Sequence, residues 1–170
     1  MLIRPERPSD AGQVREVNTL AFGGPLEADL VDRLRDNCAD ALSLVAEQDG
    51  AVVGHILFTP VTITSGGRDV VGMGLAPMGV RPERQRQGIG SALVRHGLDL
   101  LRERRCPFVV VVGHPEYYPR FGFARASLHG IRSQWDGIAE DAWMVAIIDR
   151  QAMAGVSGMA SYRDEFNGLT

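Results

Sequence analysis

One stretch in the middle of the 170-residue chain constrains its fold more than any other. An extended apolar run, Val70 to Val80, leads through the basic, glycine-containing turn Arg84–Ser91 into an amphipathic helical run, Ile89 to Leu101. A continuously apolar segment, Phe108 to Val112, follows. A strand, a helix and a second strand in this order predict two parallel strands joined by a right-handed crossover.

The remaining elements are predicted from apolar spacing and from capping and turn residues. Residues 129–141 and the tail after Asp149 have no clear pattern, and Pro77 predicts a bulge or a strand edge near it. The predicted elements are a strand at Leu2–Pro5, a helix from Ser9 or Asp10 to about Phe22, a helix after Pro25 over Leu26–Leu34, strands Leu42–Ala46 and Ala51–Thr64 around an Asp49-Gly50 turn, a helix from Gly88 to Arg104, a short helix Pro115–Phe121 and a strand Ala142–Ile148.

The chain's length and composition predict one globular domain spanning residues 1–170, with a core of about 2–148 and a C-terminal segment, 149–170, that the pattern does not assign. A net charge of −3 gives no general attraction to nucleic acid or to anionic membranes. Cys38 and Cys106 lack metal-site spacing, so neither a metal site nor a disulfide scaffold is expected. The N-terminus has no signal-peptide pattern, and the protein is expected to be cytoplasmic.

The turn Arg84–Ser91 has the features of a phosphate site, because glycines and a helix start present free backbone amides to an anion. Three interpretations of this glycine-rich turn compete, and two of them fit poorly. A dinucleotide fingerprint needs a third glycine where Leu93 stands, and a P-loop needs a Gly-Lys-Ser/Thr sequence that this chain lacks. The turn that holds the pyrophosphate of an acyl-coenzyme A fits best.

Two motifs in this region resemble the GNAT superfamily of N-acetyltransferases. Gln85-Arg86-Gln87-Gly88-Ile89-Gly90 matches the family turn Gln/Arg-x-x-Gly-x-Gly/Ala, and Leu75 to Glu83 resembles the strand that leads into it. Tyr117-Tyr118-Pro119-Arg120-Phe121-Gly122-Phe123 resembles the family's aromatic signature. The likeness covers about residues 2–148 and is greatest between Leu75 and Phe123. It is closest to a bacterial subgroup of predicted acetyltransferases.

The resemblance implies an α/β fold with a mixed, mostly antiparallel central sheet flanked by helices. A V-shaped cleft between two parallel strands would hold the pantetheine arm of acetyl-CoA, the co-substrate, and no metal is needed. The resemblance places the cofactor on main chain of the bulged strand and on amides of the turn. These predicted cofactor-binding residues are Met78, Gly79, Val80, Gln85, Arg86, Gln87, Gly88, Ile89, Gly90 and Ser91.

The resemblance also implies that Tyr118 protonates or stabilises the departing thiolate, a role that suits a phenol. The general base stays open. His114 and Glu116 follow the strand Phe108–Val112, while Glu27 and His55 lie elsewhere in the chain and are expected to be a solvated helix charge and an ordinary strand-face residue. A water chain to solvent is an equal alternative.

The sequence therefore predicts transfer of an acetyl group from acetyl-CoA to a primary amine on a small molecule or peptide. Neither nucleic acid nor a membrane is expected as a partner, and a homodimer is compatible with the sequence. The alternative is a non-catalytic acyl-CoA-binding sensor or regulatory module, which would use the same turn without turnover. The sequence does not identify the amine acceptor.

Overall fold

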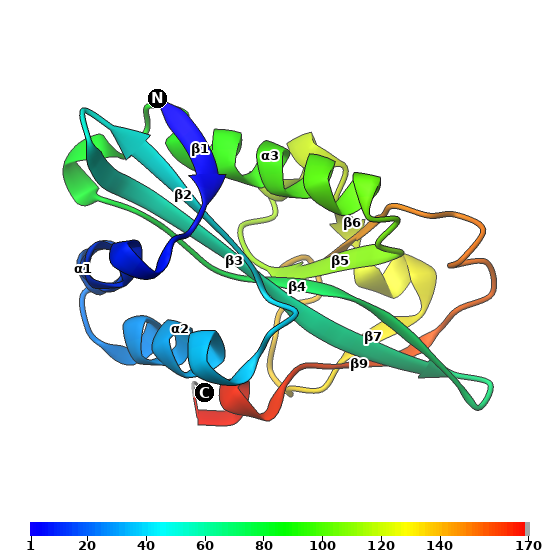
Figure 1. Cartoon of the computed structure of the whole chain (residues 1–170). Coiled ribbons are helices and arrows are strands. Elements are labelled where there is room, and N and C mark those ends of the chain that lie inside the picture. Colours follow the sequence, from blue (N-terminus) through cyan, green and yellow to red (C-terminus); the bar gives the residue numbers. More distant parts are fainter. Residues whose placement is uncertain (169–170) are drawn as a thin grey trace. The chain divides into compact units, whose positions relative to one another are not determined.

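The computed structural model describes residues 1–168, which form two compact units. Unit 1 contains residues 1–59 and 76–99 together with the described part of 164–170. Unit 2 contains residues 60–75 and 100–163. Three elements run through both units: β3 (Ala51–Ser65), β4 (Arg68–Val80) and α3 (Ile89–Glu103), shown in Figure 1.

Unit 1 joins an antiparallel set of strands to two N-terminal helices. Its elements are β1 (Leu2–Pro5), the 3-10 turn η1 (Pro8–Asp10), α1 (Ala11–Phe22), α2 (Leu26–Asn37), β2 (Leu42–Gln48), the 3-10 turn η2 (Pro82–Arg84) and the 3-10 turn η5 (Asp164–Gly168), together with its parts of β3, β4 and α3. β1 pairs antiparallel with β2, and β2 pairs antiparallel with β3. Helices α1 and α2 pack side by side (Figure 1).

The sequence explains how α1 ends and which face it buries. Val14 and Val17 are fully buried one turn apart, as expected for an amphipathic helix that packs on a sheet. Gly23 ends the helix at φ 74, and its N–H donates to the carbonyl of Thr19. Glycine suits this left-handed cap because it has no Cβ. The break at Gly23 turns the chain into α2.

Unit 2 contains the parallel strand pair that the central stretch predicts. β4 pairs parallel with β5 (Phe108–Val112), with Met73 opposite Val109 and Gly74 opposite Val110. β5 also pairs antiparallel with β8 (Trp143–Ile147). The other elements are the 3-10 turns η3 (Tyr118–Phe121) and η4 (Ala126–His129), and the short strands β6 (Ala124–Arg125), β7 (Ile131–Ser133) and β9 (Gly158–Ser161).

The predicted fold class, a mixed and mostly antiparallel sheet with helices, is confirmed. The predicted helices and longer strands are present with ends shifted by a few residues, and the short helix is confined to the 3-10 turn Tyr118–Phe121. The pattern missed β6, β7 and β9, which have two to four residues each. The bulge near Pro77, the cleft and the single domain stay predictions.

Candidate functional site

The predicted phosphate turn links the end of β4 to the start of α3 within unit 1. η2 is followed by Gln85 in extended conformation, and Arg86 and Gly88 then adopt positive φ values of 62 and 83. At the start of α3, the N–H of Ala92 donates to the carbonyl of Gly88 over 3.0 Å. Within residues 1–168, the amides from Arg86 to Gly90 donate to no protein acceptor. The turn therefore presents unpaired donors at a helix start, as an anion site requires.

Hydrogen bonds and packing hold this turn in place. The Gln85 side chain donates to the carbonyl of Val80 over 3.0 Å, which ties the turn back to β4. Ile89 is buried at the first position of α3, and a Cβ on Gly54 of β3 would lie 2.9 Å from its Cγ2 atom. Gly54 thus allows the helix start to approach the strand closely. A turn anchored at both ends loses little conformational entropy when it binds a ligand.

The three arginines in and just before the turn differ in their pairing. Arg81 forms ion pairs with Glu16 at 3.2 Å and Glu83 at 2.8 Å, so its charge is already matched. Arg84 donates to the side-chain oxygen of Gln48 over 3.2 Å. Arg86 is exposed and, in the described part of the chain, forms no ion pair. Arg86 is therefore the guanidinium best placed to meet an added phosphate.

The main chain predicted to bind pantetheine is the last part of β4, also in unit 1. Met78 and Val80 are half-buried, while Gly79 between them is buried and faces α1. A Cβ on Gly79 would lie 3.1 Å from the Cβ of Ala21 and 3.5 Å from Oδ1 of Asn18. The missing side chain at this position lets helix α1 approach the strand.

Tyr118 belongs to unit 2, where it begins η3, the next element after β5. Its ring is 7% exposed and packs edge-on against Tyr117, with ring centroids 5.0 Å apart, and against Phe123 at 5.5 Å. Burial raises the pKa of the Tyr118 phenol well above its usual value, and neighbouring Tyr117 adds to the effect. The phenol therefore keeps its proton throughout the physiological range, as a proton donor must.

The sequence did not indicate that Gly113 shapes the position of Tyr118. A Cβ on Gly113 would lie 2.2 Å from Cε2 of the Tyr118 ring. No side chain fits there, so glycine at the end of β5 is required for this ring position. Gly113 and Tyr118 are five residues apart, a spacing that places two residues side by side neither on a helix nor on a strand, so the sequence could not predict the contact.

The residues considered as the general base differ in how exposed their side chains are to solvent. His114 and Glu116 are exposed after β5, and Glu27 is half-buried in the first turn of α2. His55 lies on strand β3, as expected, but the sequence did not indicate how deeply it is enclosed. It is completely buried, and desolvation, with a contribution from Arg35, lowers its pKa to about 3. A histidine that stays neutral and sealed from solvent cannot collect a substrate proton directly.

His55 lies instead in a buried polar network in unit 1. Its Nδ1 is 3.0 Å from Nδ2 of Asn18, and its Nε2 is 2.9 Å from Oγ of Ser43. The Ser43 hydroxyl is in turn hydrogen-bonded to the carboxylate of Glu6, which Arg35 also contacts, through its Nε at 2.9 Å. The network connects α1, α2, β2 and β3 with the residue that follows β1.

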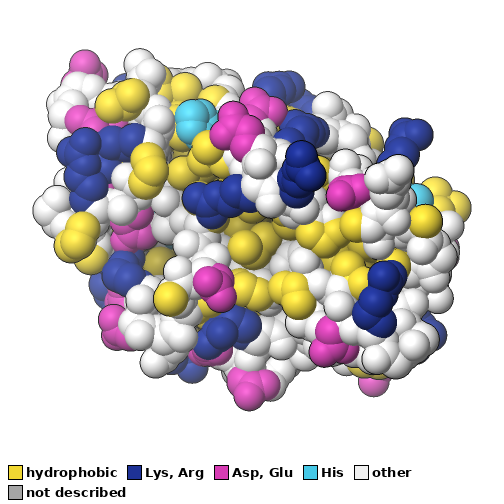
Figure 2. Space-filling model, turned by 45° about the vertical axis from the view of Figure 1, so that its right-hand side comes forward, with side chains coloured by type: hydrophobic (Ala, Val, Ile, Leu, Met, Phe, Trp, Pro, Cys, Tyr) yellow, Lys and Arg dark blue, Asp and Glu magenta, His cyan; other side chains and the backbone are white. Residues whose placement is uncertain are grey.

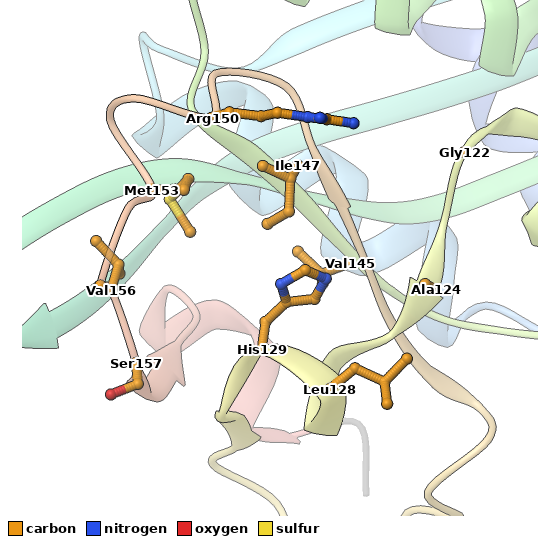
Figure 3. Close-up of a pocket in the computed structure, with 11 residues that line it drawn as sticks. Gly122, Ala124, Leu128, His129, Val145, Ile147, Arg150, Met153, Val156 and Ser157 are labelled. Carbon is orange, nitrogen blue, oxygen red and sulfur yellow. The ribbon is translucent and has the colours of Figure 1, made fainter.

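Unit 2 also contains a cavity of about 690 Å³ that none of the predicted site residues lines. Its wall is apolar along β8, at Val145 and Ile147, and along the following segment. Figure 3 shows His129 and Arg150 on opposite sides of these two β8 side chains. The cavity could hold a small molecule with an apolar body and a polar end, but it contributes nothing to the phosphate turn.

Charged side chains of both signs are interspersed on the face drawn in Figure 2, without a continuous basic surface there. In the described residues, no group of three or more His, Cys, Asp or Glu side chains is placed to hold a metal ion. None of the helices within residues 1–168 has the length and apolar character that crossing a membrane requires.

Comparison with known proteins gives consistent matches. Residues 2–126 match the family model described as an acetyltransferase (GNAT) domain. The uncharacterized N-acetyltransferase YhbS of Escherichia coli K12 is 39% identical over 168 residues, which is 98% of this chain and 99% of that protein. Among solved structures, the GNAT family N-acetyltransferase YhbS from E. coli in complex with CoA aligns with a TM-score of 0.92 and 38% identity, over 99% of this chain and 93% of that one. A GNAT family acetyltransferase from Brucella melitensis in complex with acetyl-CoA aligns at 0.80 and 36%, over 97% of each chain.

Proposed function

Because this chain belongs to the GNAT acetyltransferase family, we propose that it transfers the acetyl group of acetyl-CoA to a primary amine. It is an acetyl-CoA-dependent N-acetyltransferase, and the identity of the amine is the open part of the function. The observation that supports the proposal best is the row of unpaired amides from Arg86 to Gly90 at the start of α3. Relatives with more than 35% identity bind CoA and acetyl-CoA, which is the ligand class such a turn suits.

In the proposed complex, the pyrophosphate lies on the amides of Arg86 to Ser91 and the pantetheine arm lies along Met78 to Val80. The exposed Arg86 guanidinium adds a charge-assisted contact to phosphate. Gln85 keeps the turn and the strand together through its bond to Val80. Ligand binding then needs little rearrangement of unit 1.

The proposed reaction is direct attack of the neutral amine on the thioester. The amine nitrogen forms a bond to the acetyl carbon and the bond from that carbon to sulfur breaks. The nitrogen loses one proton, and the CoA thiolate takes up one proton. The products are the N-acetyl amine and CoA thiol, with one proton released for each ammonium ion consumed. Tyr118 is proposed to supply the proton to sulfur, because a phenol is protonated at neutral pH and can donate to a thiolate, and the tyrosinate regains a proton from solvent before the next turnover.

The proton acceptor for the attacking amine remains outside the proposal. His55 is not proposed as this acceptor, because it is completely buried and has no contact with bulk solvent. The exposed groups His114 and Glu116, the half-buried Glu27 and a chain of waters are the alternatives. A cytoplasmic location and a homodimer likewise remain expectations. The sensor alternative finds no support among the relatives, which are described as N-acetyltransferases.

A screen of amine acceptors with acetyl-CoA tests this function directly. Release of free CoA thiol is measured for small primary amines and for peptides with a free N-terminus or a lysine. We expect thiol release above the amine-free rate for a subset of acceptors, with the acetylated amine found by mass spectrometry. Acetyl-CoA binding without turnover of any amine would instead favour the sensor. A Tyr118→Phe sample separates enzymatic transfer from spontaneous acetylation.

A further inference from the structure

The buried network around His55 has a fixed direction. Ser43 must donate its hydroxyl hydrogen to Glu6, because a carboxylate only accepts. Ser43 therefore accepts from the Nε2–H of His55, over 2.9 Å. A neutral imidazole has a single N–H, so Nδ1 of His55 is an acceptor and receives an Nδ2–H of Asn18. The chain of donors runs from Asn18 to the Glu6 carboxylate.

This direction fixes which way the Asn18 amide points. Its other Nδ2–H donates to the carbonyl of Val14 over 3.0 Å. Both amide hydrogens are thus used, and exchanging the nitrogen and oxygen would break both bonds. The remaining atom, Oδ1, is buried and has no hydrogen-bond partner within the described residues. A buried acceptor left unpaired costs free energy, so its retention calls for an explanation.

The unpaired Oδ1 faces the strand that is proposed to hold the pantetheine and thioester. It lies 3.5 Å from the position that a Cβ on Gly79 would occupy. The ring of Phe22, one helical turn beyond Asn18 on the same face of α1, lies 3.5 Å from that position as well. Phe22 is 44% exposed, and a substrate nitrogen reaches Oδ1 only if this ring is displaced toward solvent.

We propose that Asn18 Oδ1 is a positioning acceptor for the attacking amine of the acceptor substrate, held in orientation by His55. This inference rests on the proposed function, because it assumes that the thioester lies along Met78 to Val80. An amine carries N–H donors on the nitrogen that attacks. One N–H directed to Oδ1 orients the nitrogen lone pair toward the acetyl carbon.

Asn18 positions the nitrogen and takes up no proton, since an amide oxygen is not a base at neutral pH. The proton that leaves the nitrogen goes to the base or water that the reaction requires in any case. His55 acts through Asn18 and does not touch the substrate. The neutral amide also suits the attack, because a carboxylate in its place would hold the amine in its charged, non-nucleophilic form.

Two CoA derivatives of matched shape probe the contact. One carries –CH2–C(O)–NH–propyl on sulfur and places an N–H one carbon beyond the position of the attacking nitrogen, on the acceptor side. The other carries –CH2–C(O)–CH2–propyl and has no donor there. Calorimetric titration gives the dissociation constant of each for the intact chain, together with that of acetyl-CoA. We expect the amide to bind about tenfold more tightly than the ketone, as for one net hydrogen bond.

The variants then assign this preference to its residue. Asn18→Leu is expected to bind acetyl-CoA within about twofold of the parent and to bind amide and ketone equally. Thr59→Val is the matched control, since Thr59 Oγ1 is also a buried oxygen that has no hydrogen-bond partner in the part of the chain that the structure describes. It should keep the tenfold preference. His55→Phe should lose the preference, and His55→Gln, which retains an acceptor and a donor, should restore most of it.

Equal affinity for amide and ketone in the parent chain would overturn the inference, as would an unchanged preference in Asn18→Leu. Should Asn18→Leu fail to fold, the His55→Phe and His55→Gln pair decides the question with the same readout. Failure of the proposed function looks different, because the parent chain would then either bind no acetyl-CoA or bind it and acetylate no amine in the acceptor screen.

Discussion

The ring of Tyr118 occupies the space that a side chain on Gly113 would take, with only 2.2 Å between Cε2 and the position of a Gly113 Cβ. Backbone at the end of β5 therefore forms one wall of the tyrosine site. Tyr117, Phe121 and Phe123 pack around the other sides of the ring. Packing contacts hold the Tyr118 ring in place, and its position requires that residue 113 has no side-chain methyl group.

Gly113→Ala tests this dependence. The added methyl must displace the Tyr118 ring, so we expect kcat to fall by about the same factor as in Tyr118→Phe, roughly a hundredfold. The affinity for acetyl-CoA should stay within about twofold, because the phosphate turn belongs to unit 1. Gly12→Ala, at a position with open space around it, is the control and should leave kcat unchanged. Full activity in Gly113→Ala would show that ring position does not matter.

Tyr118→Phe tests the proton-donor role through its pH dependence. Burial raises the pKa of this phenol, so the protonated, donating form persists on the alkaline side. In the parent chain, kcat should therefore not decline from tyrosine ionisation as pH rises from 7 to about 10, the usual pKa. The phenylalanine variant should be about a hundredfold slower throughout that range. Equal turnover of the two proteins at every pH would exclude the role.

His55 should make the stability of the protein depend on pH. Its pKa is lowered to about 3 in the folded chain and returns to about 6.5 on unfolding. Between these values the unfolded chain binds the extra proton, so stability is fully present above pH 6.5 and declines as pH falls below it. We expect the free energy of unfolding of the parent to fall by about 2 kcal/mol more than that of His55→Gln between pH 6.5 and 4.5. Urea unfolding at both pH values measures the difference, and parallel losses in the two proteins would contradict it.

The parts of the fold visible in the sequence are those that local chemistry determines. The Asp49-Gly50 turn between β2 and β3 has φ values of 53 and 78. An Asp-Gly pair adopts two positive φ values readily, which is why it predicts a tight hairpin turn. The strand, glycine turn and helix around Gly88 are likewise predicted by local features, namely apolar spacing and a glycine at the helix start. By contrast, β9 lies in the tail that had no pattern, because a four-residue strand containing glycine has little periodicity. It is defined by its partners, β3 and β7.

The candidate site shows the same division. The turn and Tyr118 come from contiguous motifs, so their residues could be predicted. The contact between Asn18 and His55 joins residues 37 positions apart, and neither residue belongs to a recognisable pattern. The sequence placed His55 on a strand face and could not show that three neighbouring elements would enclose it. Residues distant in the sequence bury His55, which keeps its imidazole neutral and makes Nδ1 a hydrogen-bond acceptor.

The central claim is that acetyl-CoA binds through its pyrophosphate at the turn Arg86–Ser91. Isothermal titration of acetyl-CoA into the parent chain, Gly88→Gln and Gly88→Glu tests it most directly. Both substitutions meet the same strain at φ 83, and only glutamate adds a negative charge. We expect Gly88→Glu to bind at least tenfold more weakly than Gly88→Gln, with a difference that shrinks as salt is raised. Equal affinity of the two variants at low salt would contradict the claim.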